Sequence, residues 1–242
     1  MARLSILRWI VAVALMLGAN APATAQTEVD LQLVLAVDAS GSVNDTRFQL
    51  QQAGYAAAFR HPRVLSAIRS GIIGSIAVTM TQWTGPSLHV VTLPWTRLYD
   101  QASVLAFADA IEKAPRDLFS GGTSISGAID HSMKLMTSSP YKGTKRVIDV
   151  SGDGANNRGR PVTEARDDAV RAGIVINGLP ILALEPYLDR YYFNNVIGGP
   201  GSFMIPAESY EKFAEAVLRK LVLEIASDNP SSRAQRSMSA AK

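Results

Sequence analysis

Strand-length apolar runs alternate along this chain with segments in which apolar residues recur at helical spacing. Leu31–Val37 is almost continuously apolar, which is typical of a strand buried on both faces of a sheet. In the next segment Phe48, Tyr55 and Phe59 fall on one helix face. The same reasoning predicts further strands over residues 72–83, 88–95, 145–150 and 174–179, and further helices over residues 104–111, 125–136, 161–172 and 210–225.

This alternation predicts an α/β fold with a Rossmann-like, doubly wound architecture, in which helices flank both faces of a mainly parallel central sheet. The segment Thr84–Ser87 (TGPS) joins two of the predicted strands in a hairpin-like connection. The last predicted helix keeps one apolar face from Tyr210 to Ile225, and we expect this face to pack on the core and close the domain. We place the domain at residues 29–226.

The first 25 residues have the features of a secretory signal peptide. Arg3 and Arg8 precede the apolar stretch Trp9–Gly18, and Ala23–Ala25 (ATA) provides a cleavage site after Ala25. An apolar stretch of about ten residues is too short to cross a bilayer as a stable helix, although a retained anchor is the alternative. We therefore expect residues 1–25 to be removed, the protein to be periplasmic or secreted, and the polar residues 227–242 to form a disordered tail.

Charge and composition exclude several classes of function. Two of the 24 basic residues and none of the 21 acidic residues lie in the signal, so the remaining chain has a net charge of +1. No basic stripe with interleaved aromatic residues is present, which argues against a nucleic-acid partner. The absence of cysteine excludes disulfides, thiolate catalysis and thiolate metal sites. We expect a monomer whose mature chain has no membrane span and relies on its apolar core.

Three short polar segments hold most of the functional signal. Asp38–Ser42 (DASGS) directly follows the first predicted strand, Gly121–Ser124 (GGTS) opens a predicted helix, and Ser151–Gly154 (SGDG) directly follows another strand. Ligands of open α/β sheets bind outside the carboxyl ends of the strands, which is where two of these segments begin. Each segment alone is also an ordinary turn or helix cap.

The shared chemistry of these segments is oxygen donation by carboxylates and hydroxyls. Such a donor set suits Mg²⁺, Ca²⁺ or Mn²⁺ better than zinc or copper. Asp38, Ser40 and Ser42 are spaced by two residues, so in an extended loop their side chains point the same way. Thr123 lies near a predicted helix N-terminus, where free N–H groups help to orient oxygen ligands.

The order of Asp38-x-Ser40-x-Ser42, Thr123 in a GGTS turn and Asp153 after a strand resembles the metal-ion-dependent adhesion site of von Willebrand factor A domains. The stretches GGTSISGAID and RVIDVSGDGANNRGRP also resemble a group of exported bacterial proteins with this domain. The resemblance implies one bound divalent cation, Mg²⁺ first, with Mn²⁺ or Ca²⁺ as alternatives. It implies hydroxyl ligands from Ser40, Ser42 and Thr123, with Asp38 and Asp153 acting directly or through water.

The resemblance further implies a position on the cation that stays open for a carboxylate of the partner. It therefore predicts an exported module for protein–protein interaction, with no catalytic residues, whose partner is an envelope or secreted protein that presents Asp or Glu. Arg158 and Arg160 follow the Asp153 segment closely, and our hypothesis is that they border the cation and favour anionic ligands. The alternative is that both are solvated loop charges.

Two other functions compete with this prediction. Val37–Ser40 and Gly152–Asn157 resemble the first and last motifs of haloacid-dehalogenase-like phosphatases, which use Mg²⁺ and a nucleophilic aspartate. That chemistry needs a second carboxylate two residues after the nucleophile, where this chain has Ser40, and the final acidic position of the last motif is Asn157. The other alternative is an interaction scaffold with the same fold that binds no metal.

Overall fold

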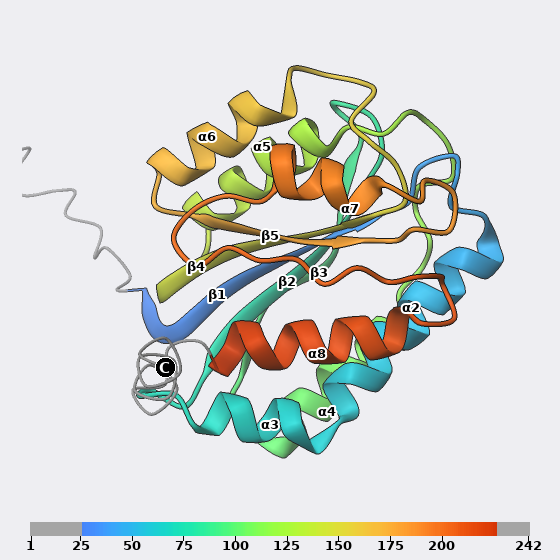
Figure 1. Ribbon diagram of the computed structural model, residues 1–242. Helices are drawn as coiled ribbons and strands as arrows, with labels where there is room; N and C mark the ends of the chain where they lie inside the picture. Colours follow the sequence, from blue (N-terminus) through green and yellow to red (C-terminus); the bar gives the residue numbers. More distant parts are fainter. Residues whose placement is uncertain (1–25, 227–242) are drawn as a thin grey trace, which may run out of the picture.

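The computed structural model describes residues 26–226, which form a five-stranded sheet with helices on both faces (Figure 1). The strands lie in the order β3-β2-β1-β4-β5, and all neighbours are parallel except β2 and β3. The strands are β1 (Thr27–Asp38), β2 (Ile76–Trp83), β3 (His89–Leu98), β4 (Tyr141–Gly152) and β5 (Val175–Pro180). The helices are α2 (Asp45–Arg60), α3 (Pro62–Arg69), α4 (Gln101–Lys113), α5 (Ile125–Thr137), α6 (Val162–Arg171), α7 (Leu188–Tyr191), the π-helical turn η1 (Tyr192–Val196) and α8 (Phe213–Ala226).

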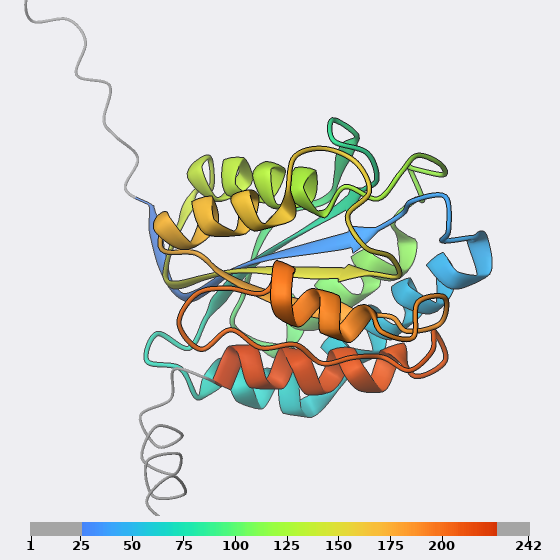
Figure 2. The same cartoon turned by 45° about the horizontal axis from the view of Figure 1, so that its top comes forward.

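Strand β1 lies at the centre of the sheet and separates two apolar cores. Leu33 and Leu35 point into a core formed with α2, α3, α4 and α8, while Val34 and Ala36 point into a second core formed with α5, α6 and η1. Figures 1 and 2 show these two helical layers on opposite faces of the sheet. The continuous apolar run of the first strand is therefore explained by burial on both faces, and the predicted doubly wound α/β fold is confirmed.

Several element boundaries differ from the sequence prediction. Strand β2 begins at Ile76 and not at residue 72, because the backbone N–H groups of Ile73 and Gly74 donate to the carboxylate of Asp30 and form a turn, which leaves Ile72 84% exposed. Strand β4 begins at Tyr141, because its first residues pair with the start of β1. Helices α3 and α7 and the turn η1 were not predicted.

Helix α8 carries two buried charged side chains, Lys220 and Glu224, on its otherwise apolar face. The Nζ atom of Lys220 lies 2.5 Å from Asp149 Oδ1 on β4 and 2.6 Å from Glu224 Oε1 one turn further along α8, and all three side chains are inaccessible to solvent. Burial, together with repulsion from Glu224, raises the pKa of Asp149. The helix is thus joined to the sheet by an ionic cluster as well as by apolar packing.

No helix within residues 26–226 combines the length and the apolar character that spanning a membrane requires. The predicted signal peptide (1–25) and the predicted disordered tail (227–242) lie outside the described residues.

Candidate metal centre

The three polar segments meet at the carboxyl edge of the sheet. Strands β1 and β4 are parallel neighbours that end at Asp38 and Gly152, so the loops that follow them leave the sheet side by side (Figure 2). The GGTS segment is fixed to both loops: Gly41 N–H donates to the Gly121 carbonyl, and Asn157 N–H donates to the Thr123 carbonyl at 2.9 Å. Residues more than 80 positions apart in the sequence thereby line one site.

The loop after β1 folds so that its side-chain oxygens converge. The backbone N–H of Ser40 donates to Asp38 Oδ1 at 2.7 Å, which closes a tight turn on the aspartate. The hydroxyl oxygens of Ser40 and Ser42 lie 3.1 Å apart. The loop therefore places these alternating side chains on the same side, as predicted.

Asp153 connects the second loop to the first. The Ser42 hydroxyl donates to Asp153 Oδ1 at 2.5 Å, and the Tyr210 hydroxyl donates to Asp153 Oδ2 at 2.8 Å. The backbone N–H of Asp153 also points to Asp38 Oδ2, at 3.4 Å. Tyr210 belongs to the turn before α8, and burial beside Asp153 raises its pKa, so it remains a hydroxyl donor at every physiological pH.

Thr123 presents a hydroxyl that has no hydrogen-bonding partner within the described part of the chain. The residue is only 6% exposed, and its backbone N–H is held by the side-chain oxygen of Asn157 at 2.9 Å. Its Oγ1 atom lies 3.6 Å from the position that a Cβ on Gly154 would occupy, which places the hydroxyl beside the loop of Asp153. The hydroxyl is therefore available as an oxygen donor to a cation at this edge of the sheet.

The electrostatics of the site favour the binding of a cation. Asp38 and Asp153 are 0% and 1% exposed, and burial followed by repulsion from Asp153 raises the pKa of Asp38 to about 7. The nearest guanidinium is that of Arg47, whose Nη1 lies 4.0 Å from Asp153 Oδ2 and donates to the Ser42 carbonyl. Two buried carboxylates beside one partly exposed arginine leave a net negative charge that a further cation would balance.

The donor set fits a hard divalent cation. It consists of two carboxylates and three hydroxyls, without nitrogen or sulfur, which is the chemistry that Mg²⁺, Mn²⁺ and Ca²⁺ accept. Within residues 26–226 no group of three or more His, Cys, Asp and Glu side chains is arranged around a common point for a metal. A cation at this edge would therefore depend on hydroxyls and water for most of its ligands.

The two arginines that the sequence pattern singled out are placed differently. Arg160 lies 2.6 Å from Asp130 on α5 and 2.6 Å from Asp168 on α6, so its guanidinium joins these two helices. Arg158 packs its side chain beside Gly122, next to Thr123. Arg158 thus borders the site, whereas Arg160 is held in an ion-pair cluster.

Sequence reasoning missed three residues that the structure places at or beside the site: Arg47, Tyr210 and Glu185. Asn44 caps α2 by accepting from the Arg47 N–H at 2.9 Å, which sets Arg47 in the first turn, with its guanidinium over the Tyr210 ring. An N-cap signal at Asn44 was available in the sequence, but the contact with Tyr210 joins segments that are far apart. No local pattern identifies it.

The positions needed for phosphatase chemistry are occupied by other groups. Ser40, two residues after Asp38, offers a hydroxyl in place of the general acid, and the side chain of Asn157 is used to hold Thr123 N–H.

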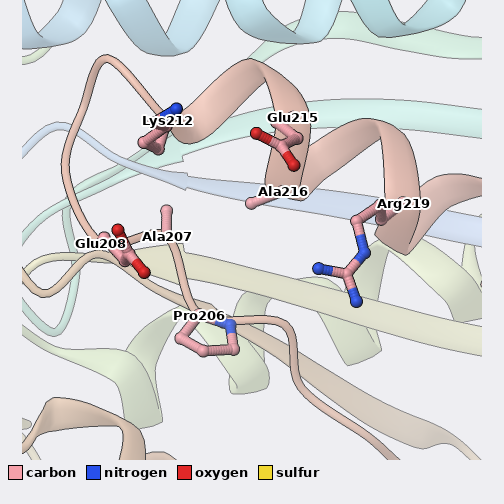
Figure 3. A pocket seen from close by; sticks show the side chains of 7 residues that line it. All are labelled: Pro206, Ala207, Glu208, Lys212, Glu215, Ala216 and Arg219. Atoms are coloured by element: carbon pink, nitrogen blue, oxygen red, sulfur yellow. The ribbon is translucent and has the colours of Figure 1, made fainter.

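A groove of about 280 Å³ runs along α8 between residues 206 and 219 (Figure 3). Glu215 and Arg219 line this groove, and none of the oxygen donors of the candidate metal centre does.

The sheet order, the single antiparallel edge strand and the two helical layers define a von Willebrand factor A-type fold, as the sequence resemblance predicted. Similar solved structures include the pilus adhesin SpaC from Lactobacillus rhamnosus GG, at 14% identity and TM-score 0.60 over 83% of this chain and 31% of that one. Another is proximal thread matrix protein 1 from the mussel byssus with a zinc-occupied MIDAS motif, at 15% identity and TM-score 0.56 over 80% and 45%. A von Willebrand factor type A protein from Catenulispora acidiphila matches at 16% identity and TM-score 0.52 over 82% and 43%.

The chain belongs to the family described as "Protein of unknown function (DUF1194)", whose model matches residues 28–229. No curated protein matches it significantly. The chain spans less than half the length of the mussel protein to which its fold is similar.

Proposed function

We propose that this protein is an exported, non-enzymatic binding module that holds one divalent cation at the edge of its sheet and uses it to bind an acidic group on a protein partner. The observation that carries the proposal is the convergence of two buried carboxylates and three hydroxyls on one side of the sheet, with too little positive charge to balance them. Mg²⁺ is the cation we propose first, because it tolerates several water ligands; Mn²⁺ and Ca²⁺ are the alternatives.

The charges around the site favour an anionic partner. Asp38 and Asp153 together balance one divalent cation, and Arg47 adds a further positive charge within 4.0 Å of Asp153. Arg158 lies beside Gly122, next to Thr123. An incoming carboxylate is then attracted by the cation and by at least one guanidinium, which is a charge-assisted arrangement.

Two similar structures support this direction, since SpaC is a pilus adhesin and the mussel protein carries zinc in its MIDAS motif. The signal peptide expected at residues 1–25 supports placing the module in the periplasm or outside the cell, and we propose that it acts there as a monomer.

The proposal is tested by a pull-down from envelope extract with immobilised protein. We expect a partner to be retained in Mg²⁺ and released by EDTA, and to be lost with the Ser40→Ala/Ser42→Ala variant, which removes two hydroxyl donors without changing charge. Arg160→Ala serves as the matched control, because it removes a loop charge that is held away from the cation by α5 and α6. Retention that is indifferent to both EDTA and the serine substitutions would support the metal-free scaffold.

A further inference from the structure

Glu185 lies in the loop that joins β5 to α7, beside the candidate metal centre. Its Oε1 atom accepts a long hydrogen bond of 3.4 Å from the Ala155 N–H, two residues after Asp153. The backbone of Glu185 is fixed by its carbonyl, which accepts from Leu188 N–H at the start of α7. The side chain is exposed and forms no ion pair with a lysine or arginine of residues 26–226.

The carboxylate of Glu185 faces the hydroxyl of Thr123 across the space over Gly154. A Cβ at Gly154 would meet Glu185 Oε1 at 3.4 Å and Thr123 Oγ1 at 3.6 Å, the two nearest atoms outside its chain neighbours. Because residue 154 is glycine, it places no side chain of its own between the two oxygens. The unpartnered hydroxyl of Thr123 and a carboxylate without an ion-pair partner among residues 26–226 thus both lie beside Gly154.

The distances place Glu185 within reach of a cation held by Thr123. Oxygens that share one ion lie at about 2.0 to 2.6 Å from it, so a change of side-chain rotamer, or one bridging water, brings Glu185 Oε1 to the ion. The charge also matches. A divalent cation between Asp38 and Asp153 leaves the positive charge of Arg47 unbalanced, and one more carboxylate neutralises it.

We propose that Glu185 is an internal acidic ligand that occupies the open position on the cation, so that a partner's carboxylate must displace it. This inference rests on the proposed function, because it requires a cation at the site. The loop between β5 and α7 then sets the affinity that an acidic partner needs in order to displace Glu185. When no partner is bound, Glu185 occupies the open position on the cation.

The test uses Mn²⁺ as the cation and acetate as the carboxylate probe. Free Mn²⁺ is measured by electron paramagnetic resonance during titration of the protein, and acetate binding to the Mn²⁺-loaded protein is followed by water-proton relaxation. For Glu185→Gln we expect Mn²⁺ affinity to fall about 10-fold and acetate affinity to rise about 3- to 10-fold, as suits the loss of one charge-assisted contact. Glu215→Gln, an exposed glutamate of α8 in the groove of Figure 3, is the control and should match the wild type in both titrations.

The variant Glu185→Asp distinguishes direct contact between the carboxylate and the cation from electrostatic attraction at a distance. Aspartate keeps the charge but withdraws the carboxylate by one methylene, so it should behave like Glu185→Gln if the carboxylate reaches the cation. A Glu185→Asp protein that titrates like the wild type, or a Glu185→Gln protein unchanged in both titrations, would overturn this inference while leaving the proposed function intact. Wild-type protein that fails to bind Mn²⁺ would instead overturn the proposed function.

Discussion

Replacing Asp38 by asparagine should stabilise the cation-free protein. The pKa of Asp38 rises from 3.8 to about 7 through burial and repulsion from Asp153. At about 1.4 kcal/mol for each pKa unit, ionised Asp38 destabilises the cation-free fold near pH 8 by about 4 kcal/mol. Asparagine removes this charge but gives up the acceptor that faces the Asp153 N–H, which costs about 1 kcal/mol. The expected net gain for Asp38→Asn is therefore about 3 kcal/mol.

The pH dependence has the same origin. A carboxyl with a raised folded-state pKa binds its proton more tightly in the folded than in the unfolded protein. Its favourable contribution is fully present below about pH 4 and is lost as the pH rises towards about 7. Urea denaturation in EDTA should therefore find wild-type protein more stable near pH 5 than near pH 8, and Asp38→Asn should flatten this difference.

Cation binding should make the wild type more stable to unfolding than Asp38→Asn. Mg²⁺ stabilises only a protein that binds it, by about 4.1 kcal/mol at a concentration of roughly 1,000 times the dissociation constant, which exceeds the advantage of about 3 kcal/mol expected for Asp38→Asn. We expect this gain in the wild type and little of it in Asp38→Asn. The reasoning would be refuted if Asp38→Asn were less stable than the wild type in EDTA near pH 8, or if the pH dependence were the same in both.

Three further substitutions test separate parts of the structure. Lys220→Met leaves two buried carboxylates without their cation and should destabilise the fold by about 3 to 5 kcal/mol in urea denaturation, whereas a loss under 1 kcal/mol would show that the cluster does not hold α8 to the sheet. Arg47→Met should weaken acetate binding to the Mn²⁺-loaded protein about 3- to 10-fold without weakening Mn²⁺ itself, and unchanged acetate binding would remove Arg47 from the site. Tyr210→Phe removes the hydroxyl that orients Asp153 and should raise the Mn²⁺ dissociation constant about 10-fold, and an unchanged constant would limit Tyr210 to packing.

The strands and the loops of the site can be predicted from sequence patterns that extend over a few residues. Strand β1 is continuously apolar because both of its faces are buried in the fold. Its parallel pairing with β4 brings the ends of both strands to the same edge of the sheet. The convergence of Asp38, Ser40 and Asp153 was therefore predictable once the two strands were assigned. The turn before β2 was not predictable, because Ile72 and Ile73 have side chains typical of a strand. The carboxylate of Asp30, 43 positions away from Ile73, instead holds the chain in a turn.

The rest of the site depends on contacts that leave no local pattern. Tyr210 continues the apolar periodicity of α8, but the helix begins at Phe213, and the tyrosine instead turns its hydroxyl to Asp153. Arg47 follows Asp45 in a polar segment, and Glu185 is the one charge in the mainly apolar stretch Ile181–Leu188. Both become relevant only through their distance from the Asp153 loop. Arg160 shows the opposite case, since its sequence position favours the site while Asp130 and Asp168 hold it elsewhere.

The most direct measurement of the central claim is isothermal titration calorimetry of EDTA-stripped protein with Mg²⁺, with Mn²⁺ and Ca²⁺ in parallel. We predict one cation bound per wild-type chain, accompanied by a rise in melting temperature, and neither effect in Ser40→Ala/Ser42→Ala, whose fold should be intact by circular dichroism. Absence of binding with all three cations, or equal binding by the wild type and the serine variant, would contradict a metal centre built from these hydroxyls and carboxylates.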